Sequence, residues 1–136
     1  MEAAKNLFDT LDSTDRHLAT HRFLCGEHLT LSDLRLFTTL LRFDAAYHVL
    51  FKCCRSKISE YRHLGGYLRD IYQTPGVART CDMGAIVEGY FGTLFPLNPG
   101  GIIPLLPQGS TGEELMKPHG RERLVGQKSP SLSAYQ

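Results

Sequence analysis

The chain has 136 residues, a length that suits a single domain with one hydrophobic core. Its apolar share of 42% is ordinary for a globular protein, and its formal net charge of +1 provides no general attraction for nucleic acid or a membrane surface. No apolar run approaches the ~20 residues of a membrane-spanning helix, and the start lacks the pattern of a signal peptide, so we expect a cytoplasmic protein.

Apolar residues at helical intervals predict a first helix over residues 2–20. This helix begins almost at Met1 without an N-cap for its first N–H groups, so we expect the chain to start within a helix, which leaves an organellar address open. A second helix is predicted from the N-cap Thr30 to about residue 50. Thr30 and Asp33 have the spacing of a capping box, in which Thr30 accepts from the Asp33 N–H and the Asp33 carboxylate reaches back.

The second predicted helix also keeps Arg42 and Asp44 among its leucines and phenylalanines. Isolated buried charges are too costly to remain unpaired. We therefore expect Arg42 and Asp44 to belong to a structural polar network with other helices.

A third amphipathic stripe predicts a helix over 60–73, which ends because Pro75 disfavours a helical conformation at Thr74. A short turn follows, and a last helix is predicted over 83–92 with Asp82 as its N-cap. No segment shows the alternation typical of a strand, so the predicted fold is all-α.

The sequence changes character at Pro96, where prolines and glycines disfavour regular helix. Residues 1–95 are therefore predicted to form the helical domain and 96–123 an extended tail that packs on it. The polar, serine-rich end, 124–136, is predicted to be disordered.

The four cysteines, Cys25, Cys53, Cys54 and Cys81, predict reduced thiols rather than a disulfide scaffold. A bridge between the adjacent Cys53 and Cys54 would strain the backbone. No CxxC pair is present, and the cysteines and histidines show no recognised ligand spacing, so we expect no metal site.

Several blocks of the sequence resemble a known family. They are LTLSDLRLFTTLLRFD (29–44), FKC (51–53), YLRDIYQTPGVA (67–78), NPGGIIP (98–104) and KPHGRERL (117–124). In this order they resemble the C-terminal helical domain of the glutathione transferases, specifically the xi class, the glutathionyl-hydroquinone reductases. The resemblance covers residues 3–124 and implies a glutathione-transferase C-terminal-like helical bundle that pairs as a homodimer.

The full chain of this family begins with a thioredoxin-like domain, which holds glutathione and supplies a catalytic cysteine in a Cys-Pro-x-Ala type motif. The present sequence has no such motif. The resemblance therefore implies the hydroquinone-binding half of a truncated thiol transferase, inactive alone and without a catalytic residue of its own. The complete enzyme would use glutathione as a cosubstrate to reduce glutathionyl-hydroquinones to hydroquinones.

Where the family reads a histidine-containing segment with two tyrosines, this chain reads GAIVEGYF over 84–91. The resemblance assigns Tyr90 to the substrate pocket, where its hydroxyl would donate to a hydroquinone oxygen. A packed core aromatic is the alternative for Tyr90, and it is the preferred interpretation for four other tyrosines, Tyr47, Tyr61, Tyr67 and Tyr72. A second function also stays open, a non-catalytic interaction or dimerisation module, because helical domains of this kind also serve as docking units.

Overall fold

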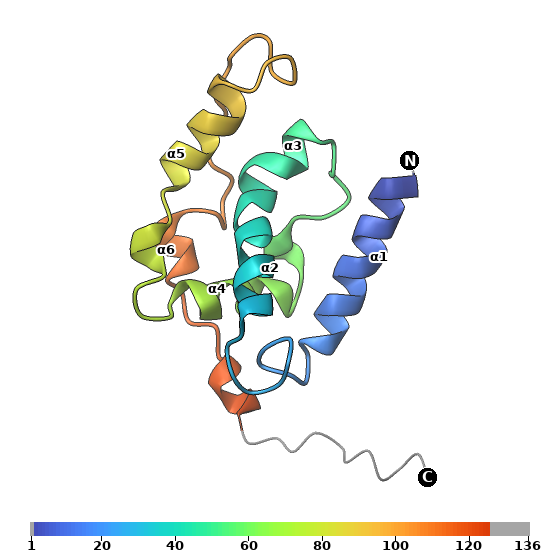
Figure 1. Cartoon of the computed structure of the whole chain (residues 1–136), viewed down its shortest axis with the longest axis vertical. Coiled ribbons are helices and arrows are strands. Elements are labelled where there is room, and N and C mark those ends of the chain that lie inside the picture. Colours follow the sequence, from blue (N-terminus) through green and yellow to red (C-terminus); the bar gives the residue numbers. More distant parts are fainter. Residues whose placement is uncertain (1, 126–136) are drawn as a thin grey trace.

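The computed structural model describes residues 2–125, and all its regular elements are helical (Figure 1). The α-helices are α1 (Glu2–His17), α2 (Leu31–Arg42), α3 (His48–Leu50), α4 (Leu64–Tyr72), α5 (Met83–Val87) and α6 (Gly112–Leu115). Other helical turns are π-helical over Phe43–Tyr47 and Glu88–Gly92, and 3-10 over Ile58–Glu60, Ala78–Thr80 and Arg121–Leu124. In the described range the strand-like pairing is confined to one bridge between Phe23 and Gly26. The prediction of an all-α fold is confirmed.

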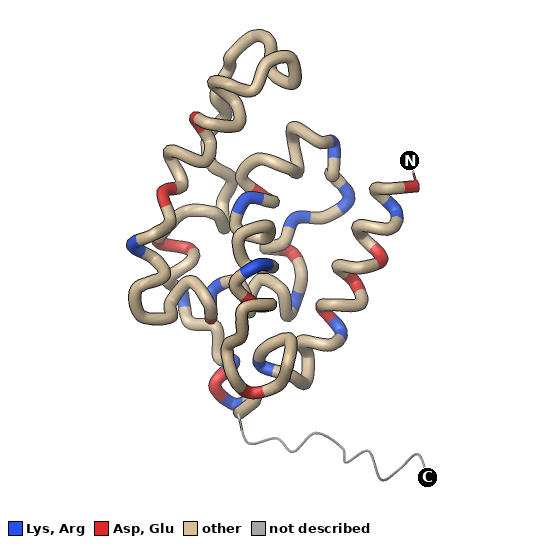
Figure 2. The backbone as a smooth tube through the Cα atoms, in the orientation of Figure 1, with Lys and Arg blue, Asp and Glu red and all other residues tan. Residues whose placement is uncertain are grey.

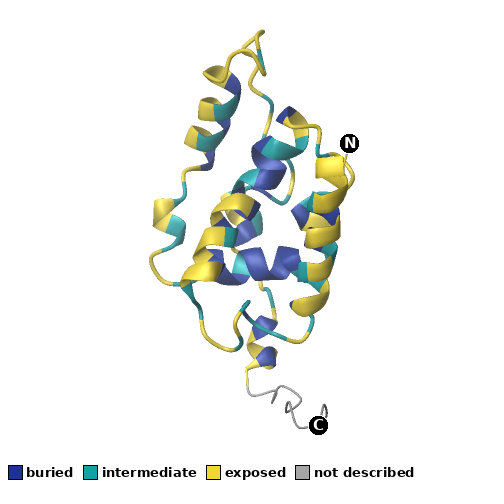
Figure 3. Ribbon diagram, turned by 45° about the vertical axis from the view of Figure 1, so that its right-hand side comes forward, coloured by how far each residue is buried: buried dark blue, intermediate teal, exposed yellow. Residues whose placement is uncertain are grey.

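Helix α2 runs through the middle of the molecule, with α1 on one side and α5 on the other (Figures 1 and 3). It contacts α4, in which Leu64, Tyr67 and Ile71 have no exposed surface. Helix α1 joins this core through Phe8, whose ring meets the Phe43 ring edge-on with the ring centroids 6.3 Å apart. The hydrophobic core therefore lies around α2 and α4, and burial of its apolar side chains is the main favourable term for folding.

Helix α2 begins at Leu31 because the Asp33 carboxylate accepts hydrogen bonds from the chain around it. The N–H and the hydroxyl of the N-cap residue Thr30 each donate to Asp33 at 2.8 Å. The Leu24 N–H and the Tyr67 hydroxyl donate to the other carboxylate oxygen, at 2.9 and 2.8 Å. Asp33 has no exposed surface. The carboxylate expected to act locally thus also joins α2 to α4 and to the α1–α2 connection.

The predicted second helix reaches residue 50, but its backbone changes type on the way. A π-helical turn over Phe43–Tyr47 separates α2 from α3, which ends at Leu50. A π-turn inserts an extra residue into a helix and so rotates the side chains that follow it. Tyr47 therefore points in a direction that an uninterrupted helix would not give it.

The other helices lie close to their predicted positions. The first ends at His17 instead of residue 20, and the predicted 60–73 helix corresponds to α4, which starts only at Leu64. Helix α5 and the π-helical turn Glu88–Gly92 fill the predicted range 83–92. Asp82 is the N-cap of α5 and accepts from the Ala85 N–H at 2.9 Å, so that prediction is confirmed.

The described tail after residue 95 consists of turns and irregular segments, and α6 and the turn Arg121–Leu124 are helical although the prolines and glycines of this region disfavour helix. Thr111 is the N-cap of α6, because its hydroxyl accepts from the Glu114 N–H. Leu115 and Leu124 are buried. The range predicted to be disordered thus begins with a buried residue, and 126–136 lie outside the described residues.

Charged residues are spread over the helices, but the uncharged segment 89–112 has no Asp, Glu, Lys or Arg (Figure 2). Among residues 2–125, no helix has the length and the apolar character that crossing a bilayer requires.

Candidate functional site

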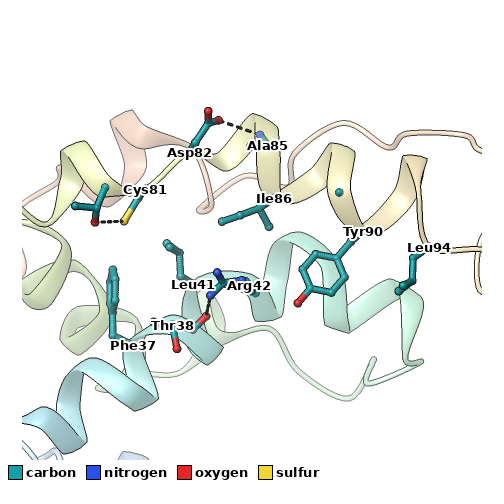
Figure 4. Close-up of a pocket in the computed structure, with 12 residues that line it drawn as sticks. Phe37, Thr38, Leu41, Arg42, Cys81, Asp82, Ala85, Ile86, Tyr90 and Leu94 are labelled. Carbon is teal, nitrogen blue, oxygen red and sulfur yellow. Dashed lines mark hydrogen bonds between the residues drawn. The ribbon is translucent and has the colours of Figure 1, made fainter.

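A groove of about 560 Å³ lies between α2 and the segment that contains α5 (Figure 4). On the α2 side it is lined by Phe37, Thr38, Leu41 and Arg42. On the other side it is lined by Thr80, Cys81, Asp82, Ala85, Ile86, Gly89, Tyr90 and Leu94. Small-molecule sites typically have such a volume and combine apolar walls with a few polar groups. The groove therefore suits a flat, largely apolar ligand with a small number of polar substituents.

Tyr90 enters the groove from the π-helical turn that follows α5, and its ring meets a second tyrosine. The hydroxyl oxygens of Tyr90 and Tyr47 are 3.1 Å apart, and the two rings meet edge-on with their centroids separated by 5.5 Å. Both side chains are half-buried. Since each tyrosine lies on a π-helical turn, two irregular helical segments are needed to bring the phenols together.

Burial raises the pKa of Tyr47 to about 12, and the hydrogen bond with Tyr90 adds to this effect. The Tyr47 phenol is therefore neutral and able to donate at physiological pH. Two hydroxyls that share one hydrogen bond retain one further proton to donate. The pair can present an O–H group to an oxygen atom of a ligand in the groove.

Arg42 and Asp44, which were expected to belong to one polar network, contact different parts of the molecule. Arg42 lines the groove, and its guanidinium donates to the Thr38 carbonyl of its own helix at 2.8 Å. Asp44 is buried and accepts from the N–H groups of Ile58 and Ser59 at 2.6 and 3.0 Å. Asp44 thus reaches another element, whereas Arg42 makes no ion pair within the described residues and leaves its charge at the groove. The interhelical role expected of Arg42 stays a prediction.

The thiols are distributed over different surfaces. Cys81 lines the groove, whereas Cys53 lies after α3, where burial raises the pKa of its thiol and the neighbouring Cys54 adds to this effect. In the range 2–125, no group of three or more His, Cys, Asp or Glu side chains is placed to hold a metal ion.

The pairing of Tyr47 with Tyr90 was missed by sequence reasoning, which placed Tyr47 in the core. The two residues are 43 positions apart, and neither has a local pattern that reveals the other. Thr30 and Asp33, at the start of α2, do not line the groove.

Comparison with known proteins identifies the fold. Residues 2–70 match the family model described as glutathione S-transferase, C-terminal domain. The glutathionyl-hydroquinone reductase YqjG of Escherichia coli is 44% identical over 125 residues, which are 92% of this chain and 37% of that protein. The glutathionyl-hydroquinone reductase PcpF of Sphingobium chlorophenolicum is 41% identical over 106 residues, 78% of this chain and 34% of that protein.

Solved structures agree with these matches. The glutathione-bound structure of YqjG aligns with a TM-score of 0.83 at 44% identity, over 89% of this chain and 38% of that one. A xi-class glutathione transferase from Natrialba magadii aligns with a TM-score of 0.84 at 41% identity, over 90% of this chain and 36% of that one. The chain spans 34–37% of the length of the two curated relatives. Because the family model covers half of its residues, the chain belongs to the glutathione S-transferase C-terminal domain family.

Proposed function

We propose that this chain is the hydroquinone-binding half of a glutathione-dependent thiol transferase that reduces glutathionyl-hydroquinones to hydroquinones. The observation that carries the proposal is the position of Tyr90 in the groove between α2 and α5, with its hydroxyl bonded to that of Tyr47. The aromatic ring of a hydroquinone would lie between Leu41 and Ile86, which line opposite walls. Relatives named as glutathionyl-hydroquinone reductases support this choice of substrate.

Tyr90 would act as a hydrogen-bond donor to a phenolic oxygen of the substrate. As the carbon–sulfur bond to glutathione breaks, electron density moves onto the hydroquinone, and a donor near its oxygen stabilises that charge. With Tyr47 donating to the Tyr90 oxygen, the Tyr90 proton is the one directed to the substrate. Arg42 adds a positive charge on the wall of the same groove.

Glutathione is proposed as a cosubstrate that is held mainly outside this chain. The tripeptide carries two carboxylates and one ammonium group, whereas Arg42 is the single cation among the residues that line the groove. By this proposal the helical half alone does not turn over substrate, because the reacting thiol and its glutathione cradle lie in the part of the relatives that this chain does not match. We also propose that the complete enzyme is a cytoplasmic homodimer whose subunits contact each other through their helical domains.

The test is the Tyr90→Phe variant in a full-length enzyme that joins this helical half to the N-terminal part of the Escherichia coli relative. We predict that kcat/KM for a glutathionyl-hydroquinone falls by about 10-fold or more, since a hydrogen bond to a charge-bearing oxygen contributes roughly 1.5–3 kcal/mol. The melting temperature should change little because the ring remains.

Tyr61→Phe is the matched control. The Tyr61 hydroxyl donates to Asp12 at 2.9 Å on the α1 side of the molecule, so its removal should leave the kinetic constants unchanged. A Tyr90→Phe enzyme with unchanged kinetics and a lowered melting temperature would assign Tyr90 to packing. The alternative, a non-catalytic interaction or dimerisation module, would then gain support.

A further inference from the structure

Two adjacent thiols, Cys53 and Cys54, lie in an irregular segment that follows α3. The Cys54 thiol donates to the His48 carbonyl at 2.9 Å, and the Cys53 thiol contacts the Phe51 carbonyl at 3.7 Å. His48 is the first residue of the three-residue α3 and Phe51 is its C-cap, so both thiols contact carbonyls of the short segment 48–51. Cys54 is exposed and Cys53 half-buried, and neither forms a disulfide.

A direct disulfide between these two residues is unfavourable. Their Cα atoms are about 3.8 Å apart because one trans peptide joins them, whereas disulfides usually span Cα separations of at least about 4.4 Å. An atom that bonds to both sulfurs lengthens the bridge and relieves this restraint. The pair is therefore better suited to chelation than to oxidation.

The number of thiols and the charge around them determine which metal or metalloid atom can bind to the two sulfur atoms. Structural zinc takes four protein ligands, and within residues 2–125 no group of three or more ligating side chains occurs. Three cations, Lys52, Arg55 and Lys57, flank the pair in sequence. Arg55 is paired with Asp12, and the charges of the two lysines disfavour a divalent cation. A trivalent arsenic compound with one organic substituent needs only two sulfur ligands and brings no charge.

We propose that Cys53 and Cys54 form a binding site for monosubstituted trivalent arsenicals, RAs(OH)2. Each thiol replaces one hydroxyl group: two As–S bonds form, two As–O bonds break, and each thiol proton leaves with a hydroxyl as water. Arsenic remains trivalent, so the step consumes no oxidant or reductant. Neither cysteine lines the groove between α2 and α5, and the site is independent of the function proposed there.

The direction of the pKa shift at Cys53 agrees with this use. Burial raises the pKa of its thiol, so the thiolate that reacts with alkylating agents and disulfides is scarce at neutral pH. Exchange with an arsenic hydroxyl starts from the protonated thiol and releases water.

The experiment uses phenylarsonous acid, the hydrated form of phenylarsine oxide, on the full chain kept reduced by a phosphine. Intact-mass analysis in an excess of glutathione should find one phenylarsenic group per chain, with the loss of two water molecules on binding. A dithiol such as dimercaptopropanol should remove it. Because the second As–S bond is intramolecular, Cys54→Ser and Cys53→Ser should each lower the affinity by about 100-fold or more.

A double variant, Cys25→Ser with Cys81→Ser, is the control and should bind as the wild type does. Cys54 is exposed, so Cys54→Ser should keep the wild-type circular dichroism spectrum even if the half-buried Cys53 does not tolerate serine. Undiminished binding by Cys54→Ser, loss of binding in the Cys25/Cys81 variant, or complete displacement of the arsenical by equimolar cadmium would each overturn the proposal.

Discussion

Asp33 is a carboxylate with no exposed surface, and four donors from three parts of the chain point at it. Burial by itself raises the pKa of such a group, but the N–H groups of Leu24 and Thr30 and the hydroxyls of Tyr67 and Thr30 together lower it below the ordinary value of 3.8. Because the folded-state pKa lies below the unfolded one, the ionised carboxylate adds stability above the ordinary pKa. That contribution is lost as the pH falls through the folded-state pKa.

We predict that Asp33→Asn lowers the free energy of unfolding at neutral pH. We also expect the free energy of unfolding of this variant to depend less on pH in the acidic range. The wild type should lose stability between about pH 5 and pH 2, and the variant should lose less over the same range. Urea denaturation at several pH values measures both effects. Asp9→Asn, on the exposed face of α1, is the control and should behave as the wild type. An equally steep acid dependence in Asp33→Asn would contradict the assignment.

At the scale of the helix, the π-helical turn Phe43–Tyr47 places Asp44 against the N–H groups of Ile58 and Ser59. Asp44→Ala leaves two N–H groups without their acceptor, one of them on the fully buried Ile58. We predict a loss of about 3 kcal/mol in the free energy of unfolding, measured by urea denaturation.

Arg42→Ala is the contrasting variant from the same helix. Arg42 donates only to the Thr38 carbonyl within α2 and is half-buried, so its removal should change the free energy of unfolding by about 0.5 kcal/mol or less. Equal losses in Asp44→Ala and Arg42→Ala would indicate a shared network instead of two tasks.

The elements differ in how far local sequence determines them. The helices and the Asp82 cap were predictable because apolar periodicity and capping depend on residues within a few positions of one another. The π-helical turns were not, since one extra residue in a helix disturbs the apolar period very little. The Tyr47–Tyr90 bond depends on both of these turns, so the groove was foreseen only in part, through Tyr90.

At the scale of the whole molecule, the uncharged segment 89–112 exposes large apolar side chains to solvent. Phe95, Ile102 and Leu105 are 76%, 77% and 95% exposed. Apolar surface of this kind favours a partner, so we predict reversible self-association of the chain at micromolar concentrations. Sedimentation equilibrium should show it.

A double variant, Ile102→Asp with Leu105→Asp, should weaken this association. Leu31→Asp is the control, because Leu31 is also exposed but lies outside the segment, at the first position of α2 where an aspartate is tolerated. A monomeric wild type at every concentration would count against pairing through this surface.

Buried Arg121 connects the C-terminal tail to the segment that follows α1. Its guanidinium donates to the carbonyls of Leu18, His21 and Arg22 at 3.1, 2.8 and 2.8 Å. We predict that Arg121→Met lowers the free energy of unfolding by about 3 kcal/mol or more, since the three carbonyls lose a charged donor. Urea denaturation measures this loss, and Arg123→Ala, an exposed neighbour, should cost about 0.5 kcal/mol or less.

These bonds also set an order of events during synthesis. The carbonyls just after α1 leave the ribosome early, yet their donor is added 99 to 103 residues later. Until Arg121 emerges, those oxygens can bond only to water or to transient partners, and the α1–α2 connection is held by its bonds to Asp33 and Asp70 without the contribution of the tail. Contacts this distant in sequence slow folding, because the long loop between them must close first. The nascent helical bundle therefore remains open to chaperones until almost all the described chain has been made.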